Sequence, residues 1–202
     1  MTILTSFCRR RVLPTSWIAA IAILMMATQA WGQTSSGAQW QRGTTLGGFA
    51  GASTADGTTA ALGTSLGWEL NRHLTIEGRG MWFPDEPDAS DFFAWLGAVV
   101  PFRPGSVIEP FASAGVGMYR ATVDAVAGDV PAFYQERMNG RQRATFDDFA
   151  LGFGGGANVF VTSHIAIRPE ITLILVTTTT EARTVPVFGV NVAYHFESHK
   201  IR

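Results

Sequence analysis

Cysteine is almost absent from this chain of 202 residues, in which Cys8 is the only one. Lysine is equally scarce, with Lys200 alone, and charged residues make up 15% of the chain, against about a quarter in ordinary soluble proteins. A single thiol excludes a disulfide framework within the chain and a metal site built from several thiolates. The formal net charge of −1 gives no indication of nucleic-acid binding.

Long apolar runs are also missing, except near the N-terminus. Arg9–Arg11 precede the apolar run Trp17–Met26, after which Ala30 and Gly32 place small residues two positions apart. This order is typical of a secretory signal peptide, whereas a transmembrane anchor would need about 20 apolar residues. We therefore predict a signal peptide over residues 1–32, Sec-type export, and a mature domain over residues 33–202. The mature chain would keep 12 of the 15 basic residues and all 16 acidic ones, for a net charge of −4.

What the mature chain does contain is a recurring period of two residues. At its end, Phe188, Val190, Val192, Tyr194 and Phe196 would share one face of a strand, and Gly189, Asn191, Ala193 and His195 the other. No stretch shows a convincing helical period. The alternation predicts an all-β fold with eight strands, at residues 42–53, 59–70, 74–83, 91–102, 108–123, 149–162, 165–178 and 184–196.

The predicted connections alternate in length. Tight turns fall at residues 70–73, 103–106 and 162–164, and longer loops at 53–58, 84–90, 124–148 and 179–183. This is the plan of an outer-membrane barrel, in which the turns and both termini lie on the periplasmic side. In a soluble sandwich, the apolar strand faces would instead meet a second sheet, and the sheets would keep open edges. We predict an eight-stranded antiparallel up-and-down transmembrane β-barrel, because closure pairs every backbone group and turns the apolar face to lipid.

Three stretches resemble the small outer-membrane β-barrel family, the OmpA- and OmpX-like proteins. They are "PFASAGVGMYR" (Pro110–Arg120), "LGFGGGANVFVTSHIAIRPE" (Leu151–Glu170) and the final strand. In that strand Gly189, Val192, Tyr194 and Phe196 are similar to the C-terminal signal recognised by the barrel-assembly machinery, although six residues follow Phe196. The resemblance implies that machinery and periplasmic chaperones as partners, and a location in the outer membrane of a Gram-negative-type bacterium.

Six charged residues occupy positions that should face the barrel interior: Glu69, Glu77, Arg79, Glu109, Arg168 and Glu170. The interior of an eight-stranded barrel is only wide enough for side chains, and buried charges need partners. The resemblance favours a structural network that fills the lumen over a set of catalytic carboxylates. Pro169 falls inside a predicted strand, where we expect that a bulge could accommodate it.

The longest predicted loop carries residues suited to surface contacts: Phe133, Tyr134, Arg137, Arg141 and Arg143. Arginine binds phosphate through two parallel hydrogen bonds, so lipopolysaccharide or a host surface is a candidate partner. The alternative is a solvated loop of mixed charge, because several acidic residues flank these arginines.

These observations predict a non-enzymatic outer-membrane barrel with a role in envelope structure or surface interaction, in contact with outer-membrane lipid and lipopolysaccharide. No cofactor, metal or nucleic acid is expected. One alternative is a lipid-A deacylase or acyltransferase, for which Ser163 and His164 are the nearest nucleophile and base. Another is a soluble secreted β-barrel that binds an apolar ligand.

Overall fold

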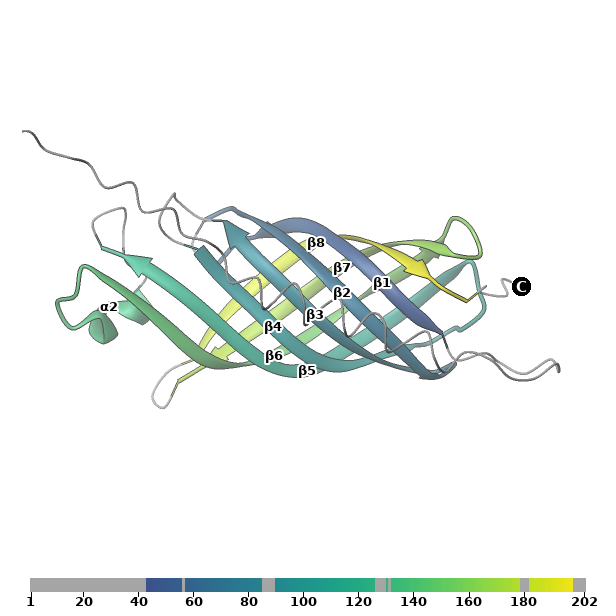
Figure 1. Ribbon diagram of the computed structural model, residues 1–202, viewed down its shortest axis with the longest axis horizontal. Helices are drawn as coiled ribbons and strands as arrows, with labels where there is room; N and C mark the ends of the chain where they lie inside the picture. The colour runs from purple at the N-terminus through teal and green to yellow at the C-terminus, as the bar shows by residue number, and fades with distance from the viewer. Residues whose placement is uncertain are drawn as a thin grey trace, which may run out of the picture. The chain divides into compact units, whose positions relative to one another are not determined.

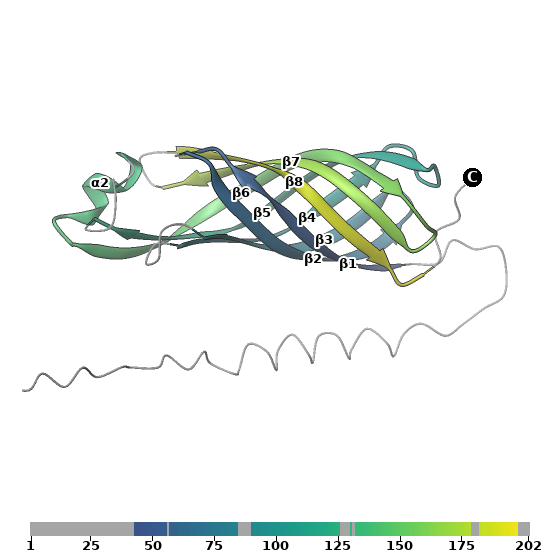
Figure 2. The ribbon, with the colours of Figure 1, turned by 90° about the horizontal axis from the view of Figure 1, so that it is seen from above.

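Eight antiparallel strands form a closed barrel in the computed structural model, which describes residues 43–55, 57–84, 90–125, 130, 132–178 and 182–197 (Figure 1). The strands are β1 (Thr44–Ser53), β2 (Thr59–Asn71), β3 (Leu74–Pro84), β4 (Ser90–Pro101), β5 (Ile108–Asp124), β6 (Arg143–Phe160), β7 (Ile165–Thr177) and β8 (Ala182–His195). Each strand pairs with the next, and β1 pairs with β8, which lies beside it in Figure 2. The predicted fold class is therefore confirmed. The predicted signal peptide lies outside the described residues.

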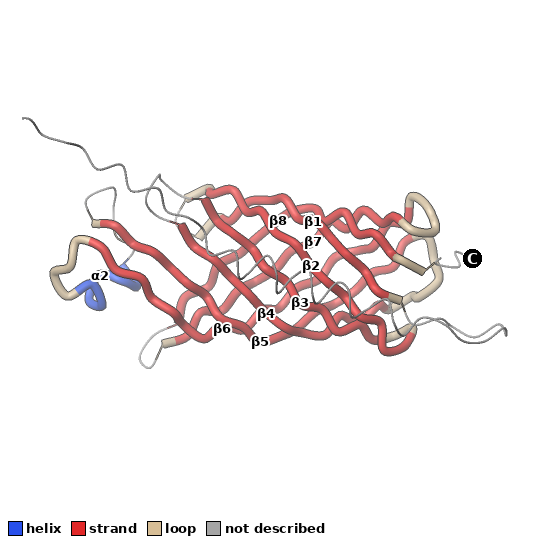
Figure 3. The backbone as a smooth tube through the Cα atoms, in the orientation of Figure 1, coloured by secondary structure: helices blue, strands red, loops and turns tan. Residues whose placement is uncertain are grey.

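Helix α2 (Ala132–Met138) interrupts the strands, in the connection between β5 and β6. Within the described residues, no helix has the length and apolar character required to cross a membrane. The three tight turns, residues 72–73, 102–107 and 161–164, lie at one end of the barrel, which we name the turn rim. Helix α2 lies at the opposite end, which we name the loop rim (Figure 3).

The barrel is apolar outside and polar or tightly packed inside. On β7, Ile167, Ile171 and Leu173 are 42–49% exposed, whereas Arg168 and Glu170 on the opposite face are at most 6% exposed. A soluble protein would show the reverse, because exposed aliphatic side chains are costly in water. Lipid around the barrel removes that cost, and closure leaves no strand edge unpaired within the hydrocarbon layer.

Strand β6 begins six residues earlier than the predicted start at residue 149. Its first residues pair with the end of β5, from Asp124 opposite Arg143 onward. In this part the outward residues are polar, as in the ion pair between Arg120 and Asp147. Where the β5–β6 hairpin projects beyond the apolar outer face of the barrel, its outward residues are polar and its inward residues apolar, the reverse of the lipid-facing part. For this reason the sequence predicted a loop over 124–148 that is longer than the observed one.

Pro169 sits in β7 without the bulge that its position in a strand suggested. The register of β7 against β6 is the same before and after it, with Glu170 opposite Gly156 and Ile167 opposite Val159. Pairing with β6 is missing only at the intervening positions, whereas Pro169 still pairs with Val190 of β8. The ladder therefore tolerates the missing N–H by a local gap on one side.

Candidate functional site: the barrel interior and its cap

Four charged side chains from two opposite strands form a central ionic layer across the lumen. Glu77 and Arg79 come from β3, and Arg168 and Glu170 from β7, with three strands between β3 and β7 on either side. All four residues are between 2% and 6% exposed. The layer contains two positive and two negative charges, so it places no net charge in the interior.

Each guanidinium of the central ionic layer contacts both carboxylates. Arg79 donates hydrogen bonds to Glu77 Oε1 at 2.6 and 3.1 Å and to both oxygens of Glu170, at 3.1 Å for Oε2. Arg168 donates to Glu77 Oε2 at 2.6 Å, and its Nε lies 2.9 Å from Glu170 Oε2. Such mutual pairing offsets the desolvation of charges in a narrow interior.

The structure brings together only four of the six charged residues predicted for this network. Glu69 lies nearer the turn rim, with Oε1 3.6 Å from His195 Nδ1. Glu109 is buried and accepts the backbone N–H of Gly105, so it closes the β4–β5 turn. These two carboxylates therefore lie outside the central ionic layer, because the register of β2 and β5 places them closer to the turn rim than β3 and β7 place theirs.

Two aromatic rings cover the central ionic layer, one on each side along the barrel. The guanidinium carbon of Arg79 lies 5.7 Å from the ring centre of Trp95, and that of Arg168 lies 4.1 Å from that of Phe111. Both rings are at most 5% exposed. These contacts add cation–π attraction and exclude water from the ion pairs.

Trp95 fits inside the barrel only because its neighbours are glycines, a relationship that the sequence analysis missed. A Cβ on Gly115 would lie 2.1 Å from Trp95 Cε3, and one on Gly97 would lie 2.2 Å from Cζ3. Gly152 faces the same ring at 3.3 Å. Three glycines on β4, β5 and β6 thus provide the space that one large indole fills.

Toward the loop rim the interior is an apolar core rather than a polar channel. Its buried residues are Phe49, Ala61, Met81, Phe83, Phe93, Trp95, Tyr119, Ala121, Val123, Tyr134, Met138, Ala150, Ile174, Val176, Val185 and Val187. Tyr134 and Met138 belong to α2, which therefore packs onto the core from the loop rim as a cap (Figure 1). The barrel is filled like the core of a soluble domain, with lipid-facing residues outside it.

Helix α2 is held by Arg137. Its two terminal nitrogens donate to the carboxylate of Asp148 at 2.7 and 2.8 Å, and its guanidinium lies 4.4 Å from the ring centre of Phe146. Phe146 also stacks on Tyr134 at 5.1 Å. Burial raises the pKa of Tyr134 above its ordinary value, and the nearby carboxylates of Asp91 and Asp148 raise this pKa further.

This arrangement changes the role expected for the loop residues. Tyr134 is 1% exposed, Phe133 is half-buried, and Arg137 is engaged with Asp148, so these three fix the cap instead of presenting a contact surface. Arg141 and Arg143 remain exposed. A seven-residue helix is too short to display a helical period, which is why the sequence predicted a loop here.

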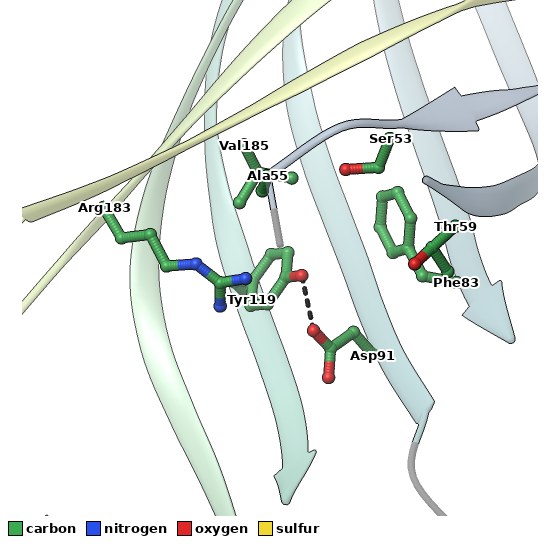
Figure 4. Close-up of a pocket in the computed structure, with 8 residues that line it drawn as sticks. All are labelled: Ser53, Ala55, Thr59, Phe83, Asp91, Tyr119, Arg183 and Val185. Carbon is green, nitrogen blue, oxygen red and sulfur yellow. Dashed lines mark hydrogen bonds between the residues drawn. The ribbon is translucent and has the colours of Figure 1, made fainter. Parts of the chain in front are cut away.

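A small chamber of about 40 Å³ lies in the mouth of the barrel at the loop rim (Figure 4). It is lined by Ser53, Ala55, Thr59, Phe83, Asp91, Tyr119, Arg183 and Val185. The Tyr119 hydroxyl donates to Asp91 Oδ2 at 2.6 Å, as the dashed line in Figure 4 marks. The volume suits a few water molecules, and it is far below that of ligand pockets, about 300 Å³ or more.

Ser163 and His164, the nearest candidates for a catalytic pair, are hydrogen-bonded at 3.0 Å between Oγ and Nδ1. They lie in the β6–β7 turn, where Thr162 Oγ1 accepts the N–H groups of His164 and Ile165. In the described part of the chain, no carboxylate orients His164, as a catalytic triad requires. Nor does any group of three His, Cys, Asp or Glu residues there form a metal site.

A closed eight-stranded barrel with an apolar outer face and a filled, charged interior defines a small transmembrane β-barrel. The family described as "Outer membrane protein beta-barrel domain" matches residues 17–196. The chain belongs to this family, which confirms the predicted resemblance. A comparison with curated protein sequences finds no match.

Solved structures of other small outer-membrane barrels are similar to this chain. The N-terminal β-barrel domain of OprF from Pseudomonas aeruginosa aligns with a TM-score of 0.60 and 15% identity over 78% of this chain and 100% of that one. Neisserial surface protein A (NspA) aligns with a TM-score of 0.56 and 14% identity, over 77% of this chain and 97% of that one. Ail, the attachment invasion locus protein of Yersinia pestis, aligns with a TM-score of 0.50 and 13% identity, over 77% of this chain and 97% of that one. At these identities the likeness concerns the fold.

Proposed function

We propose that the mature protein is a closed, non-enzymatic barrel of the bacterial outer membrane that contributes to envelope structure or surface contact. The observation that carries the proposal is the central ionic layer, which crosses the lumen from Glu77 and Arg79 to Arg168 and Glu170. The apolar core above it and the α2 cap occupy the rest of the interior toward the loop rim. A filled lumen supports a structural or surface role over transport of solutes.

In this proposal residues 1–32 direct Sec-type export, and the barrel-assembly machinery and periplasmic chaperones act on the chain before insertion. The turn rim faces the periplasm, and α2 faces outward. The exposed Arg141 and Arg143 then face lipopolysaccharide phosphates or a host surface. Tyr134 and Arg137 would instead hold helix α2 on the barrel mouth.

Cell fractionation combined with planar-bilayer recording tests the proposal. We expect the mature chain in the outer-membrane fraction, extracted only by detergent and with heat-modifiable migration on gels. Reconstituted protein should show at most small-ion leakage. A soluble periplasmic protein, or large and stable conductance for solutes, would contradict it.

Activity on lipid A distinguishes the proposal from the enzymatic alternative. Lipid A from cells that express the protein should have the same mass spectrum as lipid A from cells that express Ser163→Ala. Loss or transfer of an acyl chain that depends on Ser163 would instead assign catalysis to the Ser163–His164 pair.

A further inference from the structure

Two arginines at the turn rim have no acidic partner among the residues that the structure describes. Arg72 lies at the tip of the β2–β3 turn and Arg103 in the β4–β5 turn, and both are exposed. Neither makes an ion pair with any of the described residues. The two turns are neighbours, because β3 pairs with β4 from Thr75 opposite Val99 onward.

The acidic residues at this end of the barrel are already engaged. Glu69 contacts His195, Glu109 accepts the N–H of Gly105, and Glu197 Oε2 accepts the N–H of Thr44 at 2.8 Å. Glu69 and Glu109 also lie on the interior side of their strands, with Glu109 3% exposed. The outer surface of the turn rim is therefore positive.

The turn rim also carries exposed apolar side chains. They include Trp68, Leu70, Phe102, Val107, Val161 and Phe196, which are between 38% and 62% exposed. Aromatic residues of this kind lie at the boundary between hydrocarbon and headgroups in membrane barrels. Arg72 lies two residues after Leu70 and Arg103 directly follows Phe102. Long arginine side chains beside such interfacial residues extend toward the headgroup layer.

We propose that the turn rim binds the headgroup phosphate of anionic phospholipids in the adjoining leaflet, with Arg72 and Arg103 as the binding residues. A guanidinium matches phosphate oxygens through two parallel hydrogen bonds, and two neighbouring ones favour a lipid with net negative charge over a zwitterionic lipid. The proposal rests on the membrane location proposed above. It adds that the protein selects anionic phospholipids in the leaflet at the turn rim and that Arg72 and Arg103 bind them.

Lipid selectivity in reconstituted bilayers tests this site. The full mature chain is placed in phosphatidylcholine vesicles that contain either spin-labelled phosphatidylglycerol or spin-labelled phosphatidylcholine, and the motionally restricted fraction of each label is measured. We expect the wild-type protein to favour phosphatidylglycerol by about threefold or more at low salt, with the preference falling at high salt. The double variant Arg72→Gln/Arg103→Gln should bring the ratio close to equality.

Arg120→Gln is the matched control, because Arg120 is also exposed but its guanidinium is paired with Asp147. It should keep the wild-type ratio, and Arg72→Lys/Arg103→Lys should keep part of the preference. Heat-modifiable migration verifies that each variant is folded and inserted. An inserted wild-type barrel without preference, or a double glutamine variant with an unchanged ratio, would overturn the proposal, whereas a chain that does not insert at all would contradict the proposed function itself.

Discussion

Arg79 of β3 and Glu170 of β7 are hydrogen-bonded to each other across the lumen, although 91 positions separate them in the chain. Three strands lie between β3 and β7 in each direction around the barrel. No local segment can bring these two side chains together, so the contact exists only in the closed barrel. The pair therefore stabilises closure, and its partners Glu77 and Arg168 complete a layer of balanced charge.

Removing one charge of the central ionic layer should destabilise the barrel strongly. Arg168→Leu leaves two carboxylates, Glu77 and Glu170, with Arg79 as their only cation, and the loss of a buried partner costs about 3–5 kcal/mol. Urea unfolding in lipid bilayers, followed by tryptophan fluorescence, would measure the change. Adding Glu77→Gln should recover much of the loss, because Arg79 and Glu170 remain as a balanced pair. A single variant as stable as the wild type would contradict this account.

Gly115 should not tolerate a methyl group. The new Cβ of Gly115→Ala would lie 2.1 Å from Trp95 and 2.6 Å from the Cα of Gly97, so the strands must shift, at a cost of about 1–3 kcal/mol. Gly48→Ala is the control, because nothing lies within 4 Å of the corresponding Cβ on the outer face. Thermal unfolding should separate the two variants, and equal melting temperatures would show that Trp95 has more room than its contacts indicate.

The outer cap should depend on Arg137. Arg137→Gln removes the paired hydrogen bonds to Asp148 and the contact with Phe146, and leaves the buried Asp148 carboxylate without its cation. We expect opening of α2 to become easier by about 1–2 kcal/mol, without loss of the barrel. Hydrogen exchange over residues 132–142 would measure it, with Glu136→Gln, an exposed change in the same helix, as the control.

The cap should also weaken at alkaline pH. Because the pKa of Tyr134 is raised by burial, the folded protein holds this phenolic proton more tightly than the unfolded chain does. Stability from the buried neutral phenol is thus complete below the unfolded pKa of about 10 and is lost as pH rises above it. Absorbance titration near the phenolate band should show one late step that Tyr134→Phe removes. If Tyr134→Phe keeps the same late step, the raised pKa belongs to another tyrosine.

The aromatic residues at the end of β8 are predicted to act both as the assembly signal and as anchors at the membrane interface. Tyr194 and Phe196 are 45% and 55% exposed on the outer face, in edge-to-face contact at 5.3 Å. Changing both to Ser should lower the amount of inserted barrel sharply, because the assembly machinery would lose the aromatic signal and the membrane its interfacial anchors. Normal levels of the double variant in the outer membrane would refute the signal hypothesis.

The tail itself should matter only through its first residue. Glu197 accepts the N–H of Thr44 and so joins the end of β8 to the start of β1. Deletion from residue 198 onward should leave insertion intact, and Glu197→Gln should weaken the seam by about 1 kcal/mol. Heat-modifiable migration of the deletion variant and of Glu197→Gln would show whether each change affects insertion or the stability of the closed barrel.

The strand boundaries show where sequence patterns were sufficient. Seven strands begin and end within two residues of their predicted positions, because lipid outside and packed side chains inside impose one uninterrupted alternation. Where the strands extend beyond the membrane, lipid no longer imposes apolar outward residues. The start of β6 at Arg143 and helix α2 were both missed there, since outward positions such as Thr145 turn polar and the apolar side of α2 covers the barrel mouth.

Alternation along the chain thus determined the fold class, the strand count and which side chains face inward, because these depend on neighbours one or two residues apart. It could not determine how far along the axis each inward residue lies. Only the closed register placed Glu77 and Arg168 in one layer while leaving Glu69 and Glu109 nearer the turn rim, and only it set Trp95 against Gly115. Depth in a barrel is fixed by the stagger of strands that are distant in sequence, and this stagger is a property of the tertiary structure.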